Sequence, residues 1–260
     1  MIHQILKDRP VKLFIILAGI FITNALVAEF IGGKIFSLES TLGLDPVSFS
    51  LLGEQGLSFN LTAGVLLWPV VFIMTDIINE YYGVRGVRFL SYLTVALISF
   101  AFIAAYSAIQ LTPAPWWIGA NAEKGIPDTQ KAYAQIFGQG MWIILGSITA
   151  FLIGQILDVF VFHRIKAMTG EKMIWLRATG STLISQLIDS LVVIFIAFYP
   201  QGWSLPKILA IALVGYAYKF LVAILITPVI YAVHGLIERY LGHDLAAKMK
   251  RSAMGSEKHQ

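Results

Sequence analysis

The stretch TDIINEYYG, Thr75 to Gly83, closes an apolar run that opens near Leu61. It places Asp76, Asn79 and Glu80 at the end of a segment that is otherwise suited to hydrocarbon. On a helix, the spacing i, i+3, i+4 puts these three side chains on one face, and the glycine at i+7 continues that face. The stretch therefore predicts a membrane helix with a polar face.

The composition of the chain agrees with a membrane environment. Of its 260 residues, 57% are hydrophobic and 13% are charged, whereas soluble domains carry about 25% charged residues. The absence of cysteine excludes disulfide frameworks, cysteine-ligated zinc, iron–sulfur clusters and thiol nucleophiles. The net charge of +4 comes from basic residues scattered among short loops, so no nucleic acid is expected as a partner. We therefore predict an all-α integral membrane protein.

Six runs reach the length of roughly 20 apolar residues that a membrane-spanning helix needs. They predict a single six-helix transmembrane domain over residues 1–240, followed by a cytoplasmic tail over 241–260. Basic residues precede the first run, as in a signal peptide, but its length and the following Glu29 favour a retained span. The predicted spans are residues 13–32, 61–79, 87–110, 141–162, 173–198 and 208–233.

The distribution of Lys and Arg predicts how these spans are oriented. With the N-terminus inside, 14 of these residues fall on the cytoplasmic side and four on the opposite side. Because basic loops stay in the cytoplasm, both termini are predicted to be cytoplasmic. The long loops 33–60 and 111–139 then lie outside, with Trp116 and Trp117 as interfacial anchors or, alternatively, as a substrate gate.

The spans contain more polar residues than a purely structural membrane helix requires. A charge in hydrocarbon costs about 2.5 to 3.5 kcal/mol, so such residues are expected to face the bundle interior and to pair. Their depth along the predicted spans sorts them into two layers. The cytoplasmic layer contains Asp76, Asn79, Glu80, Gln155, Asp158 and Arg177. The middle layer contains Asn24, Ser185, Gln186, Asp189, Tyr216 and Lys219.

Each layer has a structural and a functional interpretation. A buried pair such as Asp189 with Lys219, or Arg177 with a carboxylate of its layer, can serve only to fix helix register. The amides and hydroxyl beside the first pair favour a ligand site in the middle layer, and the cytoplasmic layer suits a gate. Walker A, HExxH and GxSxG motifs are absent from the sequence, so we expect no enzyme, cofactor or metal site.

Five ordered motifs from the second predicted span to the sixth carry a resemblance to a known family. They are Thr75–Gly83, Gly154–Phe162, Trp175–Arg177 with Ser181 and Thr182, Ser185–Asp189, and Lys219 with Thr227, Pro228 and Tyr231. Together they resemble the bacterial queuosine-precursor transporters, also called the vitamin uptake transporter family. The resemblance implies a six-helix importer of the bacterial inner membrane, similar in fold to the substrate-binding components of energy-coupling-factor importers. Its implied substrates are 7-deazapurines such as preQ0 and preQ1, or queuine.

The resemblance and the two layers lead to one hypothesis of transport. We expect the base to bind at mid-membrane between spans one, five and six, where Asn24, Gln186, Asp189 and Lys219 match its donors and acceptors and Tyr216 can stack on it. The cytoplasmic layer would form the gate of a secondary transporter or facilitator.

Several alternatives stay open at this point. They are a binding subunit of an ATP-driven importer, a non-transport membrane protein, the identity of the precursor, proton coupling and a homo-oligomer.

Overall fold

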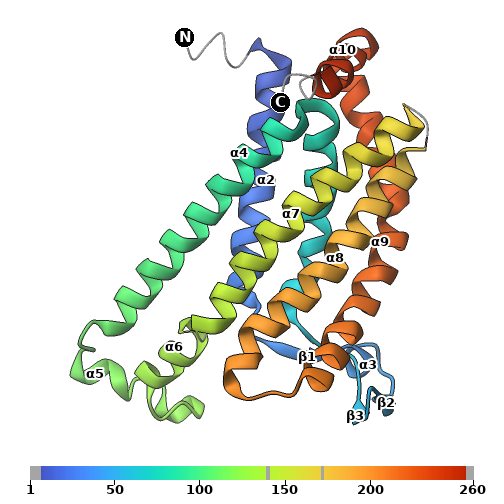
Figure 1. Cartoon of the computed structure of the whole chain (residues 1–260). Helices are drawn as coiled ribbons and strands as arrows, with labels where there is room; N and C mark the ends of the chain where they lie inside the picture. Colours follow the sequence, from blue (N-terminus) through green and yellow to red (C-terminus); the bar gives the residue numbers. More distant parts are fainter. Residues whose placement is uncertain (1–6, 139–140, 171–172, 256–260) are drawn as a thin grey trace.

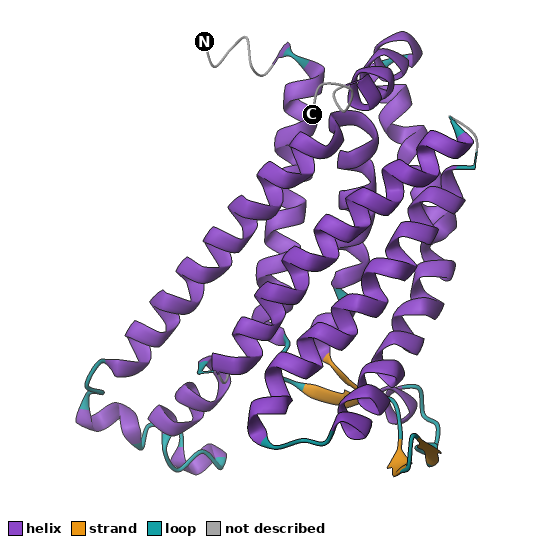
Figure 2. Ribbon diagram, viewed as in Figure 1, coloured by secondary structure: helices purple, strands orange, loops and turns teal. Residues whose placement is uncertain are grey.

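The computed structural model describes residues 7–138, 141–170 and 173–255 and shows an elongated bundle of long helices (Figures 1 and 2). Within these residues, five helical stretches are long and apolar enough to cross a bilayer. They confirm the prediction of an all-α membrane protein. The helices concerned are α2 (Arg9–Ile31), α4 (Trp68–Gln110), α7 (Met141–Thr169), α8 (Ile174–Phe198) and α9 (Leu205–Leu241).

Helix α4 reverses its direction at Gly83, where φ is 68° and ψ is −172°. Just before the reversal, the Tyr82 hydroxyl donates to the Pro10 carbonyl at the start of α2, at 2.7 Å. Further along α4, the ring of Phe102 stacks on Phe30 near the end of α2, with centroids 5.3 Å apart. The chain therefore runs along α2 in one direction up to Gly83 and returns in the other, as the cyan and green parts of Figure 1 show.

The two arms of α4, residues 68–82 and 84–110, correspond to the predicted spans 61–79 and 87–110. The predicted start at Leu61 is wrong, because this residue belongs to strand β4 (Asn60–Thr62) and pairs with Phe36 of β1 (Ile35–Ser37). The short 3-10 helix η1 (Ala63–Leu66) then leads into α4. Hydropathy alone does not separate an apolar strand and turn from the apolar helix that follows them.

The two long predicted loops contain short elements of their own. Glu39 holds the first loop together, because it accepts hydrogen bonds from the Phe59 amide at 2.9 Å and from the Ser37 hydroxyl at 3.2 Å. The bond from the Phe59 amide, followed by that from Ser37, lowers the pKa of the Glu39 carboxyl. The first loop also contains α3 (Leu38–Thr41), β2 (Phe49–Leu51) and β3 (Glu54–Leu57). The second contains α5 (Pro115–Ile118), η2 (Ala122–Lys124) and α6 (Thr129–Phe137).

Small residues bring α7 and α8 close together. Gly146, Ala150 and Gly154 recur every fourth residue, so they share one face of α7. A Cβ atom on Gly146 would lie 3.0 Å from the Val193 carbonyl oxygen, and one on Gly154 would lie 3.7 Å from the Cβ atom of Asp189. Membrane helices pack closely through such small residues, since apolar attraction between them is weak in lipid. This packing sets the depth and position of Asp189.

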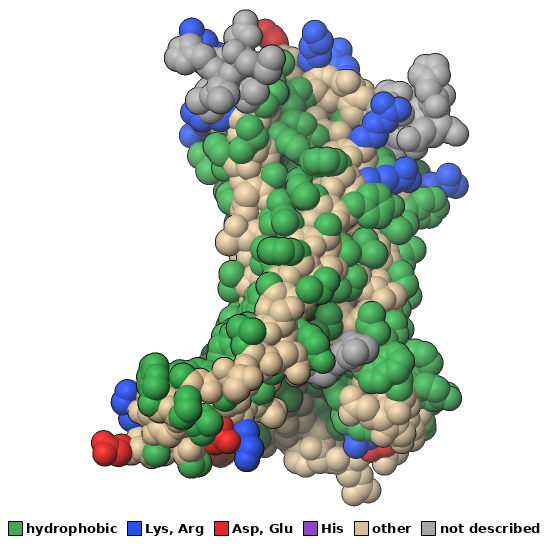
Figure 3. Space-filling view, turned by 90° about the vertical axis from the view of Figure 1, so that its left-hand side faces the viewer, with side chains coloured by type: hydrophobic (Ala, Val, Ile, Leu, Met, Phe, Trp, Pro, Cys, Tyr) green, Lys and Arg blue, Asp and Glu red, His purple; other side chains and the backbone are tan. Residues whose placement is uncertain are grey.

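Both chain termini lie at one end of the bundle, which we call the terminal end (Figure 1). There the Arg9 guanidinium donates to the Tyr240 carbonyl at 3.1 Å, and Ala253 of helix α10 (His243–Gly255) lies against Gly83. Lys and Arg side chains gather at this end, and apolar side chains cover the middle (Figure 3). The predicted tail thus begins with a packed helix. Residues 256–260 and Lys172 lie outside the described residues.

The opposite end, with the strands, α5 and α6, is called the loop end. Between the two ends, the apolar core lies mainly between α2 and the two arms of α4, where Phe21, Ile77 and Leu90 are at most 1% exposed. Helices α7, α8 and α9 lie side by side against this core (Figure 1). Buried polar residues gather where the first arm of α4 meets these three helices.

The reversal in α4 leads to a stability prediction. Substitution Gly83→Ala should destabilise the protein by about 1 to 3 kcal/mol, because the observed φ and ψ are essentially restricted to glycine. The added Cβ atom would also lie 3.0 Å from the Ala253 carbonyl oxygen. Thermal unfolding in detergent measures the effect. Gly215→Ala is the control, since that glycine is helical and has no neighbour within 4 Å of an added Cβ; equal melting temperatures of the two variants would contradict the prediction.

Candidate functional site

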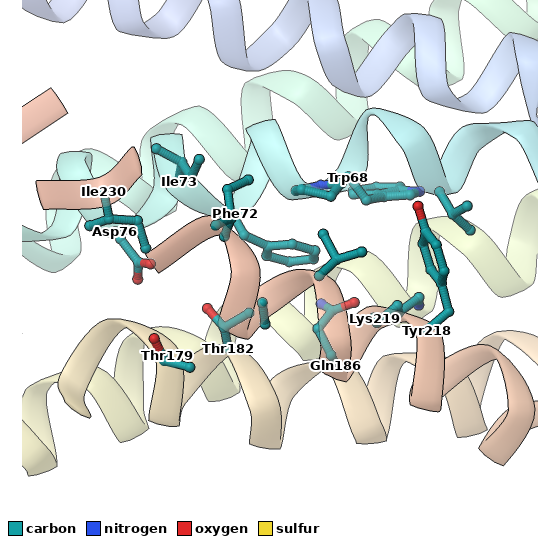
Figure 4. Close-up of a pocket in the computed structure, with 15 residues that line it drawn as sticks. Trp68, Phe72, Ile73, Asp76, Thr179, Thr182, Gln186, Tyr218, Lys219 and Ile230 are labelled. Carbon is teal, nitrogen blue, oxygen red and sulfur yellow. The ribbon is translucent and has the colours of Figure 1, made fainter. Parts of the chain in front are cut away.

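A cavity lies between the first arm of α4 and helices α8 and α9 (Figure 4). The α4 arm supplies Trp68, Phe72 and Asp76, which recur every fourth residue and so share one helix face. The cavity encloses about 450 Å³ of empty space, including its opening. Its other polar and aromatic lining residues are Thr179, Thr182 and Gln186 of α8, and Tyr218 and Lys219 of α9.

The cavity lies near the middle of the bundle along its long axis. With a helical rise of 1.5 Å per residue, Asp76 lies about 10 Å and Trp68 about 22 Å from the turn at Gly83. The cavity thus occupies the middle part of a helix bundle whose long helices have lengths suited to a hydrocarbon core of about 30 Å. Figure 4 shows Asp76 at one side of the cavity and Trp68 and Tyr218 further along it; since the arm runs from Trp68 to the turn at Gly83, the Asp76 side is the one nearer the terminal end.

Two buried acceptor atoms in this cavity lack hydrogen-bond partners among the described residues. They are Oδ1 of Asp76 and Oε1 of Gln186, and both residues are 2% exposed. Buried polar atoms are nearly always hydrogen-bonded, because an unsatisfied one costs about 1 to 3 kcal/mol. Beside them, the rings of Trp68 and Phe72 stack at an interplanar angle of 28° with centroids 6.0 Å apart. The cavity therefore suits a flat ligand that carries N–H donors.

An ion pair joins α8 and α9 next to the cavity. Nζ of Lys219 lies 2.7 Å from Oδ2 of Asp189, and the two side chains are 15% and 20% exposed. The matching depths of the two residues predicted this contact. Lys219 lines the cavity, whereas Asp189 lies behind it against Gly154 of α7. The carboxylate thus fixes the position of the ammonium group that faces the cavity.

A second, fully buried ion-pair cluster lies between the cavity and the terminal end. Oε1 of Glu80 lies 2.8 Å from Nη2 of Arg177, and its Oε2 lies 3.0 Å from Nζ of Lys166. None of the three side chains is more than 1% exposed. Arg177 also donates to the Gly170 carbonyl at 2.9 Å. The sequence left the carboxylate partner of Arg177 open, and the structure pairs it with Glu80. The cluster ties the first arm of α4 to α7 and α8.

Further hydrogen bonds join the helices that carry this cluster. The Gln155 amide donates to the Thr75 hydroxyl at 3.2 Å, and the Ser185 hydroxyl donates to Asp158 at 3.3 Å. One turn further along the same face of α4, Oδ1 of Asn79 lies 3.4 Å from Nε2 of His163 of α7. Together with the ion pairs of Glu80, these contacts involve five of the six residues of the predicted cytoplasmic layer, and the sixth, Asp76, is next to Thr75.

The structure brings part of the predicted middle layer together. Gln186 and Lys219 line the cavity, and Asp189 supports Lys219. Ser185 instead faces Asp158 of the cytoplasmic layer. The cavity is bounded by the first arm of α4, which is span two of the prediction, and not by span one.

Two other predicted residues lie outside the cavity. The Asn24 amide donates to the Ile20 carbonyl of its own helix at 2.8 Å. The ring of Tyr216 contacts Phe220, with centroids 6.2 Å apart, and is not among the lining residues. Conversely, Asp76 was assigned to the cytoplasmic layer and lines the cavity.

Sequence reasoning missed several residues of both sites. Lys166 was counted as a loop residue, yet α7 continues to Thr169 and the spacing Asp158, Phe162, Lys166 keeps its side chain on the inner face. The same spacing links Trp68 and Phe72 to Asp76, so a search at i−4 and i−8 would have found both aromatic residues. The other missed residues are Thr75, His163 and Tyr218.

The family model described as "Putative vitamin uptake transporter" matches residues 62–233. The chain belongs to this family. The predicted family is thereby confirmed, as is the expectation of a transporter in place of an enzyme. The match contains both arms of α4, all of α7 and α8, and most of α9, so it covers the cavity and the buried cluster.

Three curated proteins are similar to this chain. A protein of Bacillus subtilis (strain 168) named "Probable queuosine precursor transporter" is 32% identical over 189 residues, which are 69% of this chain and 75% of that protein. The "Queuosine precursor transporter" of Escherichia coli (strain K12) is 30% identical over 200 residues, 76% of this chain and 82% of its own. A Haemophilus influenzae protein named as in Bacillus is 24% identical over 186 residues, 68% and 69% of the two chains. No solved structure gives a significant match.

The buried ion pairs lead to a second prediction. Arg177→Ala should destabilise the protein by about 3 to 5 kcal/mol, because it removes one partner from a buried charge cluster. Arg177→Lys should recover only part of this, since lysine keeps the charge but loses the planar fork that reaches both Glu80 and Gly170. Melting temperature and purified yield are the measurements. The control is Arg239→Ala, an exposed arginine at the terminal end; an equal effect of this control would contradict a special role for the cluster.

Proposed function

We propose that this protein imports queuosine precursors of the 7-deazapurine class across the bacterial cytoplasmic membrane. The names of the relatives support the substrate class. The observation that carries the proposal is the mid-bundle cavity, in which one acceptor each of Asp76 and Gln186 has no partner among the described residues and lies beside a wall of two aromatic rings. A 7-deazaguanine ring is flat and offers an N–H group and an exocyclic amine along one edge.

The lining residues assign a role to each edge of such a base. Asp76 and Gln186 accept hydrogen bonds from the N–H group and the amine, and Lys219 donates to the ring carbonyl. Trp68 and Phe72 stack on one face of the ring, and Tyr218 contacts it from the α9 side. Of the residues predicted from the sequence for the binding site, Gln186, Asp189 and Lys219 are retained in this arrangement. Residues of α4 and Tyr218 take the place of Asn24, Ser185 and Tyr216.

The proposed topology has six crossings, with both arms of α4 counted as membrane spans. The second arm, residues 84–110, is long enough by itself, whereas the first arm, residues 68–82, reaches roughly 20 residues only together with the preceding η1. The reversal at Gly83 lies at the terminal end. Because the basic side chains gather at that end, it faces the cytoplasm and carries both termini. The strands and helices α5 and α6 then lie on the outer side, where the exposed Trp116 of α5 suits an interfacial anchor.

In this orientation the cavity is closed toward the cytoplasm by the buried cluster around Glu80. Release of the base requires the Glu80 contacts with Arg177 and Lys166, or the weaker Thr75–Gln155 contact, to separate. Transporters commonly bind substrate at mid-membrane and open one side at a time. The chain acts as a secondary transporter or facilitator in this proposal.

Ligand binding gives the sharpest test of the cavity. A panel of preQ0, preQ1, queuine, guanine and adenine should raise the melting temperature of the purified protein most for a base with the N–H and amine edge. Asp76→Asn and Gln186→Leu should each lower that stabilisation, since the first replaces one carboxylate oxygen by an NH2 donor and the second removes the amide acceptor. Asn24→Ala and Tyr216→Phe are matched controls, because both residues lie in the spans but outside the cavity. Loss of binding in the controls but not in the cavity variants would refute the assignment.

Uptake into liposomes tests the transport step separately. Protein alone should accumulate or equilibrate labelled precursor, whereas an ATP-driven binding subunit would bind the label without moving it. Lys219→Ala and Asp189→Asn should both reduce uptake by about tenfold or more, because the loss of one good polar contact corresponds to roughly 1.4 kcal/mol. Near-normal uptake by both variants would remove this ion pair from the site.

A further inference from the structure

A second cavity, apart from the first, is a groove between the second arm of α4 and α7 in the terminal half of the bundle. It contains about 1130 Å³ of empty space, including its open side. Tyr92 and Phe160 lie on its rim and are 59% and 67% exposed, so the groove opens sideways to the region where lipid would lie. Its apolar walls are formed by Val84, Val87, Leu152, Ile156 and Val159.

Basic side chains from both helices lie at this groove. Arg88 projects from α4 and Arg164 from α7, and both are exposed. Neither makes an ion pair within the described part of the chain, and none of the residues that line the groove is acidic. The groove therefore combines a positive edge with an apolar wall.

A buried hydroxyl points to a ligand in the same groove. Ser91 lines it and is 4% exposed, and its Oγ atom has no hydrogen-bond partner among the described residues. It lies three residues after Arg88, on the same face of the helix. From the turn at Gly83, Arg88 is about 8 Å and Ser91 about 12 Å along the arm. These depths match a phosphate near the membrane surface and a glycerol ester just below it.

We propose that this groove binds one anionic phospholipid of the cytoplasmic leaflet. Arg88 and Arg164 bind the phosphate, Ser91 donates to a glycerol ester oxygen, and an acyl chain lies along the apolar wall. Basic pockets between membrane helices on the cytoplasmic side bind such headgroups. The leaflet follows from the proposed orientation, but the binding itself does not depend on transport.

Lipid binding to the intact purified protein tests this site. Native mass spectrometry in a neutral detergent compares phosphatidylglycerol with phosphatidylcholine of the same acyl chains. The wild-type protein should bind the anionic lipid at lower concentration. Arg88→Ala combined with Arg164→Ala should weaken that binding by roughly 30-fold, since each basic residue near an anionic surface contributes about fivefold. Ser91→Ala should weaken it by a smaller factor.

The matched control combines Arg85→Ala with Arg239→Ala. It removes two exposed arginines from the terminal end without altering the groove, so the lipid preference should persist. Melting temperatures without added lipid check that all variants are folded. If the control lost the preference for the anionic lipid to the same extent, the preference would come from the overall positive charge of the terminal end, and the proposal would be overturned. Unchanged lipid binding in the groove variant, with slower release of a deazapurine, would also overturn it and assign the groove to the exit path.

Discussion

The contact of Glu80 with Arg177 and Lys166 is the constraint on which the rest of the bundle depends. All three side chains are buried at a depth where water is scarce, and distances of 2.8 and 3.0 Å leave little freedom to the helices that carry them. Removing Glu80 would deprive two buried cations of this carboxylate, which is far more costly than the loss of an apolar contact. The cluster therefore fixes the rotation of α4, α7 and α8 about their own axes, and with it the side chains that face the cavity.

Gly83 makes this cluster possible by ending the first arm of α4 three residues after Glu80. The reversal returns the chain along α2, and Ala253 of α10 packs against the turn. The stretch Thr75–Gly83 thus meets two physically different requirements. Its acidic and amide side chains must face α7 and α8, and its glycine must adopt a backbone conformation that other residues rarely take.

The sequence predicted the membrane class, the approximate limits of most long helices and two residues of the buried cluster, Glu80 and Arg177, because each depends on local hydrophobicity and helical spacing. It did not predict that Leu61 belongs to a strand, since strand pairing joins residues that are distant along the chain. The cavity was harder still. Depth along a span can be inferred from sequence position, but helix neighbours cannot, so Asn24 and Tyr216 were assigned to the middle layer although they lie outside the cavity. Lys166 was missed because the predicted span ended at residue 162, so the residues after it were expected to be exposed to solvent, whereas α7 continues to Thr169.

The position of Asp76 links binding to opening in the proposed mechanism. Asp76 lines the cavity and lies one helical turn before Glu80, which belongs to the buried cluster. A base that binds Asp76 therefore acts on the same rigid helix that carries the cytoplasmic closure. Thr75, the residue next to Asp76, contacts Gln155, and Gln155 lines the groove on the other side of this barrier. Because the first arm of α4 is shared by the cavity, the cluster and the turn, a small shift along this arm is enough to alter all three together.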